Sequence, residues 1–178
     1  MPARSILMDV TLPDSGATET LGRALARALP NAAAAGAVLY LHGELGAGKT
    51  TCVRSLLRTL GVAGLVRSPT YTLVETYGLP GLTCVHVDLY RLQTLTEVDE
   101  LGLRDLVGPG CLLLVEWPEK GGGHLPPADL DLYLQYADEG RRARLGADGG
   151  LGGDWLRDLG SDTSLIPYVS NLTGKILR

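Results

Sequence analysis

Apolar residues recur along the chain at two spacings, which separate predicted helices from predicted strands. Leucines at positions 21, 25 and 29 share one helical face, so a helix is predicted over residues 17–29, with Asp14 and Ser15 as candidate caps. Helical spacing also predicts a second helix over residues 51–60. Short apolar or β-branched segments predict strands over residues 6–12 (as an edge strand), 38–42, 71–77, 83–90, 111–117 and 130–136.

The segments between these elements are typical of turns, loops and less regular structure. Residues 71–90 are predicted to form a hairpin about a turn at 78–81, and residues 141–145 to pair with the strand at 130–136. The remaining predictions are a short, broken helix over 96–106, loops over 30–36 and 120–127, flexible glycine pairs at 149–150 and 152–153, a terminal helix over 155–159, and a strapped-down or disordered tail over 161–178.

Residues 43–50 lie between the strand at 38–42 and the following helix, and they match the phosphate-loop pattern Gly-x4-Gly-Lys-[Ser/Thr]. Their glycines let phosphate approach the backbone, where successive N–H groups and the helix N-terminus form an anion site. Lys49 supplies a positive charge for the β- and γ-phosphates, and the Thr50 hydroxyl is a ligand for Mg²⁺. The pattern therefore predicts a site for ATP and Mg²⁺.

Two apolar strands end in an acidic residue, and both acids are candidates for the chemistry at that site. Asp88 ends the segment 84–88, and Glu116 ends the segment 112–116. In a parallel sheet beside the phosphate-loop strand, both carboxylates emerge at the edge that carries the loop. One is expected to ligate Mg²⁺ and the other to orient water, and which does which stays open. Thr70, in a hydroxyl-rich segment around a proline, is a candidate sensor of the γ-phosphate.

These elements predict one α/β domain over residues 1–160, with a C-terminal tail over 161–178. The expected fold is three-layered and P-loop NTPase-like, with a mixed, mainly parallel sheet. Three cysteines without metal-ligand spacing are expected to be reduced core residues. The chain has no signal-peptide pattern and no apolar run long enough to span a membrane, so a cytoplasmic protein is expected.

The formal net charge of −4 argues weakly against strong, direct binding of nucleic acid. Local basic patches remain possible, and Arg141, Arg142 and Arg144 form one, with a solvated strand face as the alternative interpretation. His86, inside a strand, is expected to be a hydrogen-bonded structural histidine. Trp117 follows Glu116, and either a contact with the nucleotide or partner or simple packing would explain it.

Four segments together resemble the bacterial TsaE family (also called YjeE), and the resemblance runs from about residue 15 to 147. The order and approximate spacing of the segments match that family. They are residues 43–51, residues 68–75 (Ser-Pro-Thr-Tyr-Thr-Leu-Val-Glu), residues 86–92 (His-Val-Asp-Leu-Tyr-Arg-Leu) and residues 116–120 (Glu-Trp-Pro-Glu-Lys). The second and fourth segments are the discriminating ones. Position 87 is valine where an aromatic residue is common in the family.

The resemblance implies a small cytoplasmic P-loop ATPase needed for threonylcarbamoyladenosine formation in tRNA. Its implied partners are the TsaB and TsaD proteins, whose assembly it supports or resets by slow ATP hydrolysis, so that tRNA is affected only indirectly and no membrane is involved. The implied catalytic residues are Asp88, Glu116, Lys49 and Thr70, and the implied metal ligands are Thr50, Glu116 and Asp88. The residues implied to bind the nucleotide are Ser15, Glu44, Leu45, Gly46, Ala47, Gly48, Lys49, Thr50, Thr51 and Arg141.

Two other functions are compatible with the phosphate loop. A small-metabolite kinase would need an acceptor pocket and usually a mobile lid bearing arginine, for which residues 141–144 are the candidate although they read as a strand. A nucleotide-gated binding module would bind ATP with negligible hydrolysis. Acceptor-dependent turnover separates the first alternative from an ATPase, and single-turnover measurement separates the second.

Overall fold

The fold is built on one mixed sheet, and the computed structural model describes it over residues 5–30 and 36–173. In the described residues the sheet has eight strands in the order β3-β4-β5-β2-β6-β7-β1-β8. Their bounds are β1 Ile6–Leu12, β2 Ala37–His42, β3 Val74–Leu79, β4 Leu82–Asp88, β5 Cys111–Glu116, β6 Leu130–Tyr136, β7 Arg141–Ala147 and β8 Val169–Thr173.

The four central strands β4, β5, β2 and β6 run parallel, and the pairings outside them are antiparallel. β2 lies between β5 and β6, so the loop that follows it opens at the carboxyl edge of three adjacent parallel strands. In open α/β sheets this edge is where ligands bind. The predicted α/β class with a mixed sheet is confirmed.

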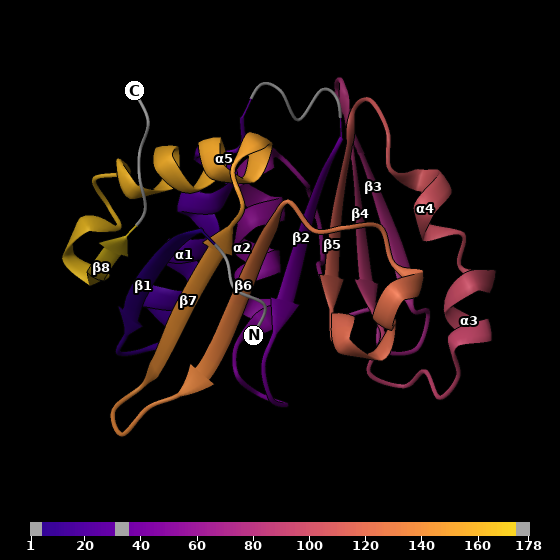
Figure 1. Cartoon of the computed structure of the whole chain (residues 1–178), viewed down its shortest axis with the longest axis horizontal. Helices are drawn as coiled ribbons and strands as arrows, with labels where there is room; N and C mark the ends of the chain where they lie inside the picture. Colours follow the sequence, from indigo (N-terminus) through magenta and orange to yellow (C-terminus); the bar gives the residue numbers. More distant parts are fainter. Residues whose placement is uncertain (1–4, 31–35, 174–178) are drawn as a thin grey trace.

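Helices cover both faces of the sheet and give the three predicted layers (Figure 1). One face carries α1, α2 and α5, and the other carries the two short helices α3 and α4 together with the segment after β5. The helices are α1 Ser15–Arg27, α2 Lys49–Leu60, α3 Leu95–Glu100, α4 Leu103–Leu106 and α5 Gly150–Gly160, with 3-10 turns η2 Pro118–Lys120, η3 Gly122–His124 and η4 Ile166–Tyr168.

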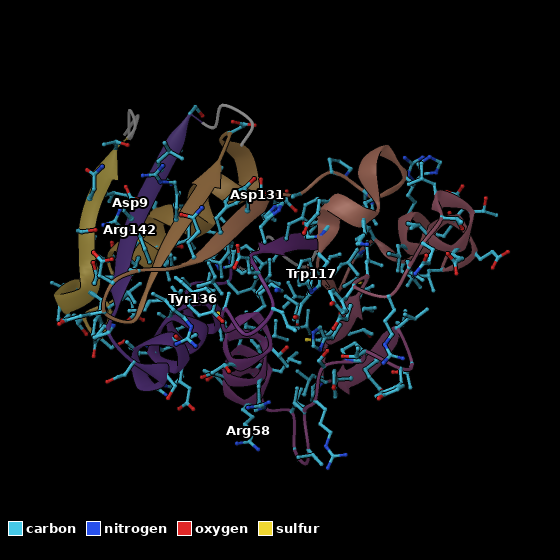
Figure 2. The ribbon with its side chains drawn as sticks, turned by 90° about the horizontal axis from the view of Figure 1, so that it is seen from below. Asp9, Arg58, Trp117, Asp131, Tyr136 and Arg142 are labelled. Atoms are coloured by element: carbon cyan, nitrogen blue, oxygen red, sulfur yellow. The ribbon has the colours of Figure 1, made fainter. Side chains whose placement is uncertain are left out.

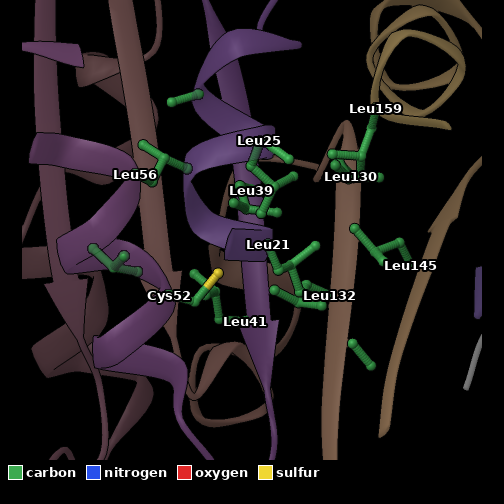
Figure 3. Packing of buried hydrophobic residues seen from close by; sticks show 14 of the residues in the cluster. Leu21, Leu25, Leu39, Leu41, Cys52, Leu56, Leu130, Leu132, Leu145 and Leu159 are labelled. Carbon is green, nitrogen blue, oxygen red and sulfur yellow. The ribbon is translucent and has the colours of Figure 1, made fainter. Parts of the chain in front are cut away.

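Two apolar cores lie on opposite faces because successive residues of each central strand point to opposite sides. Leu39 and Leu41 of β2 pack beneath α1 and α2, against Leu21 and Leu56 (Figure 3). Val38 of β2 belongs to the second core, beneath α3 and α4. Strands buried on both faces read as continuous apolar runs, which is why β5 was recognisable in the sequence, whereas β6 was recognised by its alternation.

The helix ends follow local capping chemistry. The side chain of Asp14 accepts a hydrogen bond of 2.8 Å from the Ala17 amide and caps α1, so the first predicted cap is confirmed. Thr94 and Glu97 form a reciprocal capping box at the start of α3. The predicted broken helix is indeed two helices, because Gly102 adopts φ 59° between them.

Three sequence predictions need correction. β1 is not an edge strand, because β8 pairs with it on the side away from β7. Glycines 150, 152 and 153 are not a flexible link but lie within α5. A side chain at Gly152 would collide with the carbonyl oxygen of Asp129, so this glycine allows α5 to approach the start of β6 closely. The predicted hairpin is present, although β3 begins at residue 74 rather than 71.

The segment after α5 straps the first helix to the sheet. Arg27 of α1 binds Asp162 through two hydrogen bonds of 2.8 and 3.1 Å, and the Trp155 indole N–H donates to the Leu25 carbonyl at 2.9 Å. The Arg27 guanidinium lowers the pKa of Asp162 to about 2. The predicted tail is therefore strapped down over residues 161–173, while residues 174–178 and most of the predicted loop at 30–36 lie outside the described residues. Among the helices described, none has the length and apolar character needed to cross a membrane.

Candidate active site

The phosphate loop is held in shape by glycines that no other residue could replace without strain. Gly43, Gly46 and Gly48 have φ angles of 138°, 76° and 107°. A side chain at Gly43 would also collide with the Leu134 carbonyl oxygen of β6. The loop is thus pressed against the sheet, and Gly48 directs the chain into the first turn of α2. This is the backbone that the sequence pattern predicts.

Lys49 is folded back over the loop. Its Nζ donates to the carbonyl oxygens of Gly43 and Glu44 at 2.6 and 2.9 Å, and it lies 3.9 Å from the centroid of the Trp117 ring. Burial lowers the pKa of Lys49, and the carboxylates of Glu116, Asp88 and Glu119 oppose that shift. The positively charged ammonium group is therefore partly shielded from water, and the face of the Trp117 ring stabilises it.

Glu116 connects the phosphate loop to two neighbouring elements. The Thr50 hydroxyl donates to its Oε1 and Oε2 at 2.9 and 3.1 Å, and His86 Nε2–H donates to Oε1 at 2.9 Å. Glu116 and His86 are both buried, at 2% and 0% exposure. His86 Nδ1 has no hydrogen-bond partner in the described structure. His86 is therefore hydrogen-bonded, as predicted, and its bond positions the Glu116 carboxylate at the end of β5.

Asp88 lies beside Glu116 at the end of the adjacent parallel strand, in register with it. Its Oδ2 accepts hydrogen bonds from the hydroxyls of Ser68 and, at 3.3 Å, Thr70, while its Oδ1 accepts one of 3.0 Å from the Tyr90 amide. The two hydroxyls are 2.7 Å apart. The predicted switch segment is thus attached to the second acid, so a change at Asp88 reaches Thr70 directly.

These groups line one cleft at the carboxyl edge of the sheet. Its walls are Leu45, Gly46, Gly48, Lys49, Thr50, Thr51, Ser68, Thr70, Asp88, Tyr90, Glu116 and Trp117. The cleft brings together residues from four sequence segments that lie up to 72 positions apart (45 to 117). Hydroxyl and carboxylate oxygens are the ligands that Mg²⁺ prefers, and it retains several waters and phosphate oxygens besides. The donor set of Thr50, Glu116 and Asp88 fits that pattern, although no preformed cluster of three His, Cys, Asp or Glu ligands occurs in the described residues.

Arg141 reaches the loop from β7. Its guanidinium donates to the Gly46 carbonyl at 3.1 Å, and its Nε is buried without a hydrogen-bond partner in the described structure. An unpaired buried donor beside an anion-binding loop is consistent with a contact to a bound nucleotide. Tyr136, which the sequence analysis did not single out, donates its hydroxyl to the Leu45 carbonyl at 2.9 Å. The predicted pairing of its strand with residues 141–145 could have indicated that Tyr136 lies near Arg141 and the phosphate loop.

The remaining predicted nucleotide contacts differ in how closely they approach the cleft. Glu44 contributes its carbonyl oxygen to Lys49, and Ala47 is buried under the loop, with its amide donating to the Glu44 carbonyl at 3.2 Å. Ser15 is exposed at the first position of α1 and is not part of the cleft wall. Thr18, one turn further along, lies closer to the loop, since its methyl group would be 3.3 Å from a side chain at Gly48. The role of Ser15 stays a prediction.

His42, directly before the loop, is held by two acids. Its Nε2 lies 2.8 Å from Asp131 Oδ1, its Nδ1 lies 3.5 Å from Glu119 Oε2, and its ring stacks on Tyr133. Burial disfavours the charged imidazolium, but the hydrogen bonds to Asp131 and Glu119 outweigh burial and raise the pKa of His42. This cluster ties β2, β6 and η2 together beneath the loop.

The basic patch predicted at residues 141–144 does not exist as a patch. Arg141 turns towards the phosphate loop, and Arg144 is bound to Asp9 through hydrogen bonds of 2.7 and 3.3 Å. Arg142 and Arg144 are both exposed on that strand, and among the described residues only Arg144 of the two is ion-paired. Alternation along the strand places Arg142 and Arg144 on one face and Arg141 on the other, and Asp9 of β1 neutralises Arg144. The three cysteines are free and buried, as predicted.

Known proteins match this chain over most of its length. Residues 12–144 match the family model described as "Threonylcarbamoyl adenosine biosynthesis protein TsaE". The tRNA threonylcarbamoyladenosine biosynthesis protein TsaE of Haemophilus influenzae is 46% identical over 115 residues, which is 65% of this chain and 73% of that protein. The protein of the same description from Bacillus subtilis is 34% identical over 120 residues, covering 67% and 75% of the two chains.

A solved structure shows the same architecture over nearly the whole described chain. The crystal structure of YdiB from Bacillus subtilis superimposes with a TM-score of 0.67 at 25% sequence identity. The match covers 90% of this chain and 98% of YdiB.

Proposed function

The chain belongs to the TsaE family, and from that premise we propose that it is an ATPase that binds and slowly hydrolyses Mg-ATP to support or reset a TsaB–TsaD complex. That complex would form threonylcarbamoyladenosine in tRNA in the cytoplasm. The family's role in threonylcarbamoyladenosine biosynthesis is the established part. ATP turnover, Mg²⁺ and the two partners are the proposed part.

One observation carries the proposal. Lys49 and Thr50 of the phosphate loop lie in a single cleft with two carboxylates from adjacent parallel strands, Asp88 and Glu116. Binding a phosphate alone requires only the loop and its lysine. Two acids at the same edge add what hydrolysis needs, namely a ligand for a divalent ion and a group that orients water.

Each residue then has a distinct role. Lys49 exchanges its bonds to the loop carbonyls for bonds to the β- and γ-phosphates. Thr50 and Glu116 would hold Mg²⁺, which neutralises charge that develops on the transferred phosphoryl group. Asp88 accepts a proton from, or orients, the attacking water, and its hydrogen bonds to Ser68 and Thr70 relay the state of the γ-phosphate to the segment before β3. Arg141 binds nucleotide phosphate or sugar from the β7 side.

A low basal rate follows from the contacts that these residues make with one another. Lys49 is satisfied by two carbonyl oxygens and Thr50 by Glu116, so nucleotide binding must exchange those bonds before it gains new ones. Each exchange reduces the net gain, because only the difference between the two sets of bonds contributes. A partner that closes over the cleft would complete the charge stabilisation and raise the rate.

The rim of the cleft offers a surface for such a partner. Large apolar side chains are exposed at the loop tip and at neighbouring positions, with 70% exposure for Leu45, 83% for Tyr71, 41% for Tyr90 and 55% for Tyr136. Arg91 lies 4.2 Å above the Tyr71 ring and fixes it in that position. Exposed aromatic and apolar groups with an arginine are typical of interface centres. We infer that the TsaB–TsaD complex docks over the nucleotide and that the effect on tRNA chemistry passes through that complex.

A kinase is less well supported. The only lid candidate from the sequence is residues 141–144, which belong to β7. This strand pairs antiparallel with β1 on one side and with β6 on the other. A closing lid needs a segment that moves.

The test is to measure phosphate release from Mg-ATP by the chain alone, with TsaB and TsaD, and with common hydroxyl acceptors, alongside threonylcarbamoyladenosine formed per TsaD. Slow release that the partners accelerate, together with more than one turnover of TsaD only when ATP is hydrolysed, supports the proposal. Acceptor-dependent consumption of ATP would assign a kinase instead, and multiple TsaD turnovers without any hydrolysis would contradict the resetting role.

A further inference from the structure

A second polar depression lies on the outer surface of α1 and α2, away from the sheet. Three guanidinium groups line it, Arg23 from α1 and Arg54 and Arg58 from α2, and we refer to it as the arginine groove. The α2 residues lie on one helical face, since Thr51, Arg54 and Arg58 are spaced three and four positions apart. Figure 2 shows Arg58 projecting from α2 away from the body of the protein.

The positive charge of the arginine groove is largely uncompensated. Arg54 donates its Nε to the Val66 carbonyl at 3.0 Å, and no ion pair involves Arg54 or Arg58 in the described structure. Arg23 is 3.7 Å from Glu19, the single carboxylate in the groove, which is itself half-exposed. Surface pairs of this kind contribute little, so the groove keeps a net positive charge of about two (three arginines and one glutamate).

That charge stands out against the rest of the molecule. The whole chain has a net charge of −4, and other arginines are neutralised locally, such as Arg27 by Asp162 and Arg144 by Asp9. Acids are concentrated on the opposite face, on α3 and α4, at residues 97, 99, 100 and 105. The net charge therefore hides a separation of charge, with one basic surface opposite an acidic one.

The arginine groove adjoins the nucleotide cleft. Thr51 lines both, so the groove begins one residue after the metal-binding position proposed for Thr50. α2 contributes residues to both, Lys49 to Thr51 at its start to the cleft and Thr51 to Thr59 to the groove. A ligand in the groove would thus lie next to the nucleotide without occupying the same space.

We propose that the arginine groove binds the phosphodiester backbone of RNA, an inference that rests on the proposed role in tRNA modification and adds a direct contact to it. Arginine forks bind phosphate oxygens in pairs, and the Thr51 hydroxyl supplies a further donor, whereas that of Thr59 donates to the Ser55 carbonyl. Arg54 and Arg58 are one helical turn apart, on the order of 6 Å along the axis, which is similar to the separation of successive phosphates on a strand. The residues that line the described groove include no aromatic ring on which a base would stack, so binding is independent of sequence.

The test uses fluorescence anisotropy with an unmodified tRNA transcript between 50 and 200 mM salt. Arg58→Glu is the first variant, because Arg58 is exposed and substitutions at such surface positions change stability little. The double variant Arg54→Gln/Arg58→Gln is the second. The matched control is Arg142→Glu, which makes the same change of net charge at an exposed position on β7. Phosphate release from ATP is measured on every variant.

Three results together would support the proposal. The parent binds the tRNA in a salt-dependent way, Arg58→Glu lowers the affinity about 10-fold or more, and the slope of log affinity against log salt concentration falls by about one for each arginine removed. Equal affinity in parent and variants, or an equal loss in Arg142→Glu, would overturn it. Binding of a polyglutamate peptide as tight as that of the tRNA would assign the groove to an acidic protein and also overturn it. Retained ATP hydrolysis with no RNA binding would refute this inference alone, whereas absent hydrolysis would refute the proposed function.

Discussion

The Thr50 hydroxyl donates to both carboxylate oxygens of Glu116, at 2.9 and 3.1 Å. These residues are 66 positions apart, and the adjacency of β2 and β5 places the first turn of α2 next to the end of β5. A hydroxyl and a carboxylate in this contact form half of an oxygen site for a divalent ion before any ion is bound. The account of the chain as an ATPase depends on this pair and on Lys49 beside it.

Removing either acid is expected to separate nucleotide binding from hydrolysis. In Glu116→Ala and in Asp88→Ala, ATP stays bound through the loop, while the hydrolysis rate falls at least about 100-fold, since the metal and the oriented water supply several kcal/mol of transition-state stabilisation. Equilibrium ATP binding and single-turnover phosphate release measure the two effects. Normal turnover in both variants would mean that the two-acid site is wrongly assigned.

His86 is expected to act on hydrolysis through Glu116 rather than through the fold. His86→Leu removes the donor to Oε1, so the Mg²⁺ concentration for half-maximal hydrolysis should rise by about 10- to 100-fold. His86→Gln retains an N–H donor and should restore part of the effect.

The melting temperature distinguishes the two roles for His86. His86→Leu removes a donor to the buried Glu116 carboxylate, which costs stability, and also removes the unpartnered Nδ1, which offsets part of that cost, so a net loss of no more than about 1–3 kcal/mol is expected. A large loss of stability with unchanged Mg²⁺ dependence would show that His86 only supports packing.

Lys49 is expected to contribute to ATP affinity by charge. Lys49→Ala should weaken ATP binding by about 10- to 100-fold, because a hydrogen bond to a charged phosphate is lost. Lys120→Ala is the matched control, since Lys120 is exposed on η2 and does not line the cleft. Titration calorimetry measures the ATP affinity of both variants. Equal affinities of Lys49→Ala and Lys120→Ala for ATP would show that Lys49 does not contribute to ATP binding.

His42 should make stability depend on pH above its unfolded-state pKa of 6.5. The acids Asp131 and Glu119 raise its folded-state pKa above the unfolded value of 6.5, despite the opposing effect of burial. Its stabilisation is therefore fully present below about pH 6.5 and is lost as pH rises through the folded pKa. The difference in free energy of unfolding between the parent and His42→Gln should shrink from pH 6 to pH 9, as measured by urea titration. A difference that is constant or grows with pH would contradict this.

Much of the fold could be predicted because its signals are local. The phosphate loop, the apolar central strands and the leucine spacing of α1 each depend on residues close in sequence. The errors arose where distant elements decide the outcome. β1 became an internal strand only because β8 returns to pair with it, and the glycines of α5 are helical because the helix must approach Asp129.

The candidate site divides in the same way. Lys49, Thr50, Asp88 and Glu116 follow from a motif and from strand ends, and the structure brings all four together. The bond from His86 to Glu116 required the registration of β4 against β5, which no periodicity encodes. The arginine groove was missed because Arg23 and Arg54 meet only after α1 packs on α2, while the run at 141–144, prominent in the sequence, is dispersed by its strand.

The most direct test is a crystal structure of the chain with Mg²⁺ and a non-hydrolysable ATP analogue. The account predicts that Lys49 Nζ leaves the carbonyls of Gly43 and Glu44 for the phosphates, and that the metal density lies against Thr50 and Glu116. An analogue bound elsewhere, with Lys49 still on both carbonyls and Thr50 still on Glu116, would contradict it.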